Sequence, residues 1–140
     1  ELYQISIVYV ANTLAAFVLM NLMASKIKIS NVAKFKIGTG STTFVFVGLA
    51  LINDWWMAMP FMALVGVTWA LLYIGGSFHL MENNPRSTST GIFSSTISIG
   101  AVVGPIIAGA IAFAFNYVSV MYFAIAIIIV AFGVSLKIKS

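Results

Sequence analysis

Five long apolar stretches, separated by short polar segments, dominate the hydropathy pattern of this chain. They cover residues 3–24, 37–53, 56–78, 90–113 and 117–136. At about 1.5 Å of rise per residue, each would form a helix of roughly 25 Å or more, which crosses a hydrocarbon core of about 30 Å with help from its ends. The pattern predicts an all-α integral membrane protein whose five transmembrane helices form a single domain over residues 1–140.

Composition strengthens this interpretation and removes several functional classes. Apolar residues make up 61% of the chain and charged residues 7%, whereas roughly 25% of a soluble domain is charged. The chain has no cysteine and one histidine, so no disulfide, metal site or other cofactor is expected. The net charge of +4 does not indicate nucleic-acid binding, because the cations lie in short runs between the apolar stretches.

The cations instead predict an orientation in the membrane, because Lys and Arg favour cytoplasmic loops. They fall between the first and second stretches, between the third and fourth, and after the fifth. In chain order they are Lys26, Lys28, Lys34, Lys36, Arg86, Lys137 and Lys139. We therefore expect a multi-pass protein of the cell membrane, with the N-terminus of this segment outside and its C-terminus in the cytoplasm.

The fourth stretch is unusual for a membrane helix, because it contains several glycines and Pro105. Small residues recur every four positions, at Thr96, Gly100, Gly104, Ala108 and Ala112. This spacing gives one side of the helix a smooth groove that another backbone can approach closely. Pro105 removes a main-chain donor, which a membrane tolerates only where neighbours re-satisfy the freed carbonyl. We expect the groove to face protein rather than lipid.

The five stretches contain no Asp, Glu, Lys or Arg. Proton relays and buried ion pairs in membranes need such groups, so these stretches offer no carboxylate for proton coupling. The sequence also lacks a nucleophile paired with a base and a glycine-rich phosphate loop before a helix. We therefore do not expect an enzyme.

Two aromatic residues of the third stretch are candidates for the wall of a substrate cavity. Trp69 and Tyr73 share a helical face with Gly66 and Gly76. Such a face suits a cavity, and packing of both rings against neighbouring helices is the alternative.

Polar residues of the first and fourth stretches are the other cavity candidates. Asn12 lies near the middle of its stretch, where an amide needs a wet cavity or a structural partner on another helix. Ser94 and Ser98 lie one turn apart and either face the same space as Asn12 or bond the carbonyl four residues back.

Residues 85–109 resemble the major facilitator superfamily of secondary transporters. The run Arg86-Ser87-Thr88-Ser89-Thr90-Gly91 is similar to the family's cytoplasmic R-(small)-x-(small)-x-G pattern at the start of a helix. The run from Gly100 to Gly109, GAVVGPIIAG, is similar to its G-x-x-x-G-P-x-x-G-G pattern with Ala108 for one glycine. The resemblance implies a bundle of two related halves of six helices, of which the five stretches form an incomplete half.

The resemblance leaves two assignments of the five stretches to the helices of the family, either helices eight to twelve or helices two to six. Asn21, Ser25 and Lys26 stand where the first-half loop motif of the family has Gly, Asp and Arg. Such degenerate copies are typical of the second half, so the C-terminal portion, helices eight to twelve, is favoured.

The resemblance also implies transport of a small organic solute by alternating access, with efflux as one candidate direction. The partners would be the solute, the lipid bilayer and missing N-terminal helices of the same protein. Gly91, Gly100, Gly104, Pro105 and Gly109 would form a helix-packing and conformational motif. Lys26 and Arg86 would make contacts in the cytoplasmic loops. The alternative is a self-contained five-span scaffold or subunit that oligomerises through the glycine-rich fourth helix.

Overall fold

The computed structural model describes residues 2–25 and 28–138, and in this part of the chain all regular structure is α-helical. The helices are α1 (Leu2–Ser25), α2 (Asn31–Ala50), α3 (Trp55–Glu82), α4 (Arg86–Ala114) and α5 (Tyr117–Leu136). The predicted all-α class is therefore confirmed.

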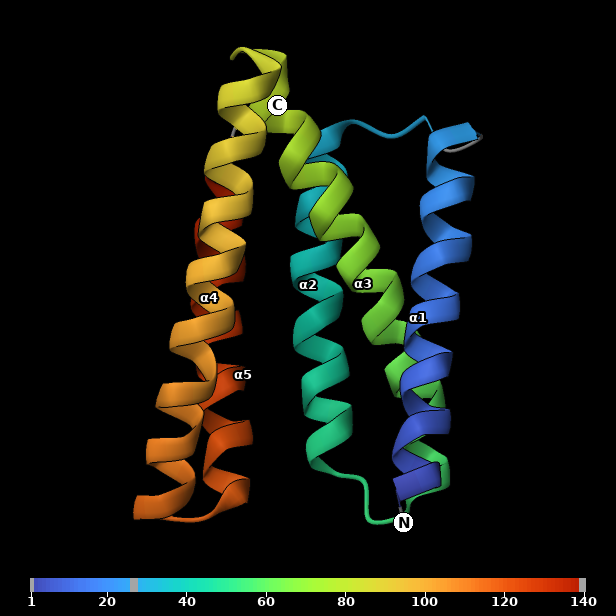
Figure 1. Cartoon of the computed structure of the whole chain (residues 1–140), viewed down its shortest axis with the longest axis vertical. Coiled ribbons are helices and arrows are strands. Elements are labelled where there is room, and N and C mark those ends of the chain that lie inside the picture. Colours follow the sequence, from blue (N-terminus) through green and yellow to red (C-terminus); the bar gives the residue numbers. More distant parts are fainter. Residues whose placement is uncertain (1, 26–27, 139–140) are drawn as a thin grey trace.

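The helices run alternately in opposite directions, as Figure 1 shows. The α1–α2 and α3–α4 connections and the end of α5 lie at one end of the bundle, and the α2–α3 and α4–α5 turns lie at the other. The described cations all belong to the first of these ends, in the α1–α2 connection, the first turns of α2, the start of α4 and the residue after α5.

Helix α3 organises the packing. It tilts across α2 and contacts α1, α2 and α4 (Figure 1). Helix α2 lies against α3 and α5, and α4 contacts α3 and α5. Within the described residues α1 packs on α3 alone.

Most apolar side chains lie on the surface of this bundle. The buried apolar residues of the described chain are Met23, Val32, Val45 and Ala70, whereas Phe113 is 96% exposed. Among the described helices, α1, α3, α4 and α5 are long and apolar enough to cross a membrane. Exposed apolar surface on such helices fits a membrane-embedded protein, because lipid tails solvate it without cost.

Helix α2 differs most from the sequence prediction. It was expected over residues 37–53 and instead begins at Asn31 and ends at Ala50. The Ser30 hydroxyl oxygen accepts a hydrogen bond from the Ala33 N–H at 3.2 Å and caps the first turn. Hydropathy does not detect such a cap, because the first turns of α2 also carry two lysines.

Close approaches between helix backbones occur at glycines of α2 and α3. A Cβ added to Gly66 would collide with the main-chain oxygen of Asn12 in α1. A Cβ added to Gly75 would lie 2.7 Å from the main-chain nitrogen of Phe35 in α2. These glycines let α1 and α2 pack directly on the α3 backbone.

The glycines of α4 behave differently. Apart from adjacent residues and the nearby backbone of α4 itself, no atom of the described chain lies within 4 Å of a Cβ added to Gly91, Gly100, Gly104 or Gly109. Pro105 lies between them, inside the helix. The part of the predicted groove that Gly100 and Gly104 form therefore has no close neighbour on another helix within the described residues.

Candidate functional site

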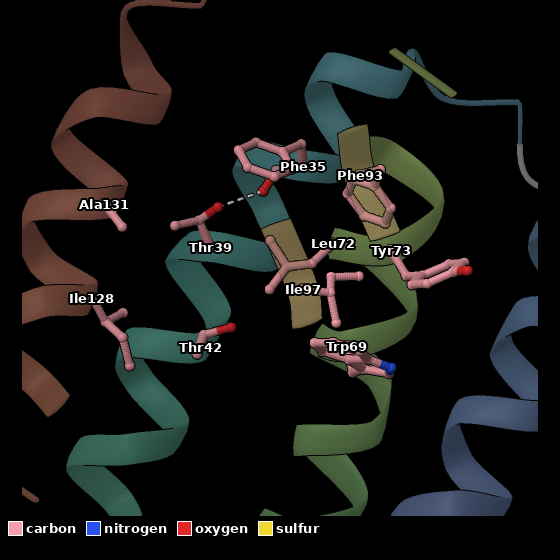
Figure 2. Close-up of a pocket in the computed structure, with 10 residues that line it drawn as sticks. All are labelled: Phe35, Thr39, Thr42, Trp69, Leu72, Tyr73, Phe93, Ile97, Ile128 and Ala131. Atoms are coloured by element: carbon pink, nitrogen blue, oxygen red, sulfur yellow. Dashed lines mark hydrogen bonds between the residues drawn. The ribbon is translucent and has the colours of Figure 1, made fainter. Parts of the chain in front are cut away.

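An apolar cavity of about 280 Å³ lies among α2, α3, α4 and α5 (Figure 2). It brings together both aromatic candidates of the third stretch, Trp69 and Tyr73. Its walls are Phe35, Thr39, Thr42, Trp69, Leu72, Tyr73, Phe93, Ile97, Ile128 and Ala131.

Three aromatic rings form a continuous cluster along this cavity. The Trp69 and Tyr73 rings lie 6.2 Å apart at an interplanar angle of 45°. The Phe93 ring of α4 meets Tyr73 edge-on, with centroids 5.3 Å apart and an angle of 77°. A Cβ added to Gly76 would lie 2.9 Å from a Phe93 ring carbon, so this glycine makes room for the ring. Aromatic pairs prefer such tilted and edge-to-face arrangements, so the cluster holds α3 against α4.

The threonines of the cavity direct their hydroxyl protons to their own helix. Thr39 Oγ1 donates to the Phe35 carbonyl at 2.8 Å, the bond drawn in Figure 2. Thr42 Oγ1 donates to the Gly38 carbonyl at 2.7 Å. Neither hydroxyl retains a proton to donate to a ligand, and no charged side chain is among the described residues that line the cavity.

The remaining polar groups of the cavity are on the two aromatic residues of α3. Figure 2 shows the Tyr73 hydroxyl and the Trp69 ring nitrogen on the side away from Thr39 and Ile128. Trp69 is 47% exposed and Tyr73 41% exposed. The interior of the cavity is therefore formed by ring faces and aliphatic groups.

Asn12 lies on the other side of Trp69. It lines a separate pocket with Thr13, Ala16, Phe17, Met20 and Trp69. Trp69 thus borders both spaces, and its ring stands between the α1 side and the apolar cavity. The Asn12 backbone is also the point at which α1 meets Gly66.

The structure does not bring Ser94 and Ser98 to either space. Both are exposed, and neither is among the lining residues of the cavity or of the Asn12 pocket. The residues directly before them, Phe93 and Ile97, occupy the cavity side of α4. A helix turns by about 100° per residue, so the serines point away from that side.

The glycine-rich part of α4 continues its cavity-lining face. Gly100 and Gly104 follow Phe93 and Ile97 by two helical turns and therefore share their side of the helix. Gly91 and Gly109 lie on other sides. The predicted groove and the observed cavity wall are thus successive parts of one face.

A polar cluster joins α2 to α3 at the cation-bearing end. Asn31 Nδ2 donates to Glu82 Oε1 at 2.7 Å, and His79 Nδ1 lies 3.1 Å from Glu82 Oε2. Lys34 Nζ donates to Asn31 Oδ1 at 3.4 Å. The cluster connects the first turn of α2 to the last turn of α3.

Arg86, the predicted cytoplasmic contact, begins α4 beside this cluster. It lines a second, more polar pocket with Asn31, Phe78, Met81, Glu82 and Thr90. Lys26, the other predicted contact, lies outside the described residues. No group of three or more His, Asp or Glu side chains in the described chain is placed to hold a metal ion.

Sequence reasoning missed most of the cavity wall, including Phe35, Thr39 and Phe93. A polar run at residues 38–43, GTGSTT, was a usable signal, because hydroxyls and glycines inside a membrane helix favour contact with protein over lipid. Phe35 stands between two lysines, and because of this polar surrounding nothing in the sequence indicated that Phe35 lines a cavity.

Comparison with known proteins found no matching family model, no matching curated protein and no matching solved structure. The resemblance to the major facilitator superfamily therefore stands on the motifs of residues 85–109 and stays a prediction.

Proposed function

We propose that this chain belongs to a secondary transporter of the major facilitator type, in which it supplies five of the helices. The transporter moves a small organic solute across the cell membrane by alternating access, and no catalysis is involved. The observation that carries the proposal is the cavity, because Trp69 and Tyr73 meet Phe93 there inside a bundle of membrane-type helices. Ligand sites of helical bundles form between helices in this way.

In this proposal α2 also crosses the membrane, which makes five transmembrane helices in all. It packs against both α3 and α5, and Lys34 in its first turns is only 7% exposed. Protein neighbours shield its polar residues from lipid, which compensates for its weaker hydropathy. The cation-bearing end then lies in the cytoplasm, following the preference of Lys and Arg for that side.

Helix α4 is the proposed moving element. Its glycine face is open in the described chain and continues the cavity wall. Helices of the other half of the transporter would pack into it and slide or bend about Pro105 as the cavity opens to alternate sides. Arg86 would contact the cytoplasmic loops of that half in one state.

Cavity accessibility tests this mechanism without knowledge of the solute. The chain has no cysteine, so Ile97→Cys supplies a single thiol in the cavity. A membrane-impermeant thiol reagent should label it both in right-side-out and in inside-out vesicles. Adding Gly104→Leu should trap one state and restrict labelling to one side, while membrane insertion and yield stay unchanged.

The matched control is Gly133→Leu, because this α5 glycine is also open to its surroundings. It should leave labelling from both sides intact. Labelling of Ile97→Cys from a single side in the parent protein contradicts alternating access. Two-sided labelling that survives Gly104→Leu contradicts the role given to α4. Uptake in proteoliposomes, once a solute is known, should fall with Gly104→Leu in the same way.

A membrane scaffold is the second candidate, and the open glycine face of α4 favours it. Two copies could pack through Gly100 and Gly104 as close-packed membrane helices do. A stable, monodisperse oligomer in detergent that Gly104→Leu reduces to monomer would support the scaffold. A monomer, or aggregation of the isolated chain, would favour the transporter.

A further inference from the structure

We infer that the cavity among α2, α3, α4 and α5 binds a neutral, planar aromatic molecule of one or two rings. This inference names the substrate class of the proposed transporter and rests on that function for its physiological meaning. The binding itself depends only on the groups that line the cavity.

Charge is the first restriction on the ligand. No acidic or basic side chain is among the described residues of the wall, and the Thr39 and Thr42 hydroxyl protons go to carbonyls of α2. A carboxylate or ammonium group would lose its hydration there without gaining a side chain of opposite charge, and an ammonium group would gain only ring faces and hydroxyl oxygens. Sugars and other ligands rich in hydroxyls are disfavoured for the same reason.

The aromatic cluster is the second restriction. Tyr73 and Phe93 already meet edge-on, and Trp69 adds a tilted ring 6.2 Å from Tyr73. A further flat ring can stack against these rings with offset or edge-to-face geometry, which a saturated chain cannot do. Aromatic ligands therefore gain more from this wall than lipid acyl chains of equal size.

Size is the third restriction. The cavity measures about 280 Å³, at the lower limit of the roughly 300–1,000 Å³ typical of small-molecule sites. One ring or a fused pair fits this volume.

Tryptophan fluorescence measures the binding directly. Trp55→Phe and Trp56→Phe together leave Trp69, in the cavity wall, as the sole tryptophan of the chain. Three para-substituted nitrobenzenes of similar shape differ mainly in charge: 4-nitrotoluene, 4-nitrobenzoate and 4-nitrobenzylammonium. In phosphatidylcholine nanodiscs, 4-nitrotoluene should quench Trp69 saturably, and both charged analogues should bind at least about tenfold more weakly.

A second variant measures how much of the quenching comes from simple partitioning of 4-nitrotoluene into the lipid. Trp55→Phe with Trp69→Phe leaves Trp56, which is 64% exposed and outside the cavity. Its quenching should rise linearly with 4-nitrotoluene and not saturate. Linear, unsaturated quenching of Trp69 as well would overturn the inference.

Competition separates an aromatic site from a lipid site. Toluene and methylcyclohexane have nearly the same size, and only toluene has an aromatic ring. At equal concentration in the nanodisc, toluene should displace 4-nitrotoluene roughly fivefold more effectively. Equal displacement would show that any hydrocarbon, acyl chains included, fills the cavity, and the inference would be wrong.

Substitutions then test whether the ligand binds at the aromatic wall of the cavity. In the Trp69-only protein, Tyr73→Ala should weaken 4-nitrotoluene binding about tenfold, because it removes a ring of the wall. Tyr73→Phe keeps the ring and should bind like the parent. Tyr122→Ala, on an exposed part of α5, is the matched control and should change nothing. Saturable binding without two-sided labelling of Ile97→Cys would refute transport and leave this site intact, so the two proposals fail separately.

Discussion

Gly66 of α3 lies directly against the main chain of Asn12 in α1, so closely that a Cβ at this position would collide with the Asn12 carbonyl oxygen and approach its side-chain oxygen to 2.9 Å. Gly66 is buried, and α3 is the helix on which α1 packs in the described chain. The close approach of the two backbones at this point therefore depends on the absence of a side chain at position 66.

Gly66→Ala should lower the stability of the folded protein by about 1–3 kcal/mol, because the added methyl group must push two backbones apart. Gly133→Ala is the matched control, since open space surrounds that α5 glycine in the described chain. The measurement is unfolding in sodium dodecyl sulfate, followed by circular dichroism. Equal unfolding midpoints for the two variants would contradict the close α1–α3 packing.

Asn31→Ala should loosen the connection between α2 and α3 at the cation-bearing end. The substitution removes the 2.7 Å hydrogen bond to Glu82 and the acceptor that Lys34 uses. We expect faster hydrogen–deuterium exchange in the first turns of α2. Asn84→Ala is the control, because Asn84 follows α3 and its Nδ2 donates, among the described contacts, only to the Leu80 carbonyl in the last turn of that helix. If both variants exchange at the parent rate, the interhelical bond contributes nothing to local stability.

The proposed topology predicts that α2 separates two loops across the membrane. Lys28 precedes α2 and Asp54 follows it, and both are exposed. In intact cells an impermeant maleimide should label Asp54→Cys, while Lys28→Cys should react only after permeabilisation. Labelling of both positions from one side would show that α2 does not cross. Labelling of Lys28→Cys alone would reverse the proposed orientation.

The cavity shows which features of a site local sequence pattern can predict and which it cannot. Trp69 and Tyr73 lie one turn apart in a helix, so their common face follows from their spacing alone. Their partner Phe93 comes from another helix, and no local pattern relates it to them. The choice between Phe93 and Ser94 as the cavity-facing residue of α4 depends on the rotation of that helix, which its contacts with α3 and α5 determine.

The glycines also show a limit of local sequence pattern. The spacing of Gly100 and Gly104 predicted close approach by another backbone, yet within the described chain such close backbone approaches occur at other glycines, among them Gly66 and Gly75. A glycine motif permits close approach but cannot say which helix is near. Proximity depends on the whole arrangement of the bundle.

The sequence by itself determined five helices, of which four are long and apolar enough to cross a membrane, their alternating directions and the gathering of the described cations at one end. These properties are local, because main-chain hydrogen bonds form within each helix and each segment partitions into lipid according to its own composition. Only the tertiary structure decided the start of α2, the meeting of Gly66 with Asn12 and the aromatic wall that Phe93 completes. Those features depend on how each helix rotates and tilts against partners distant in sequence, and packing over the whole bundle sets both.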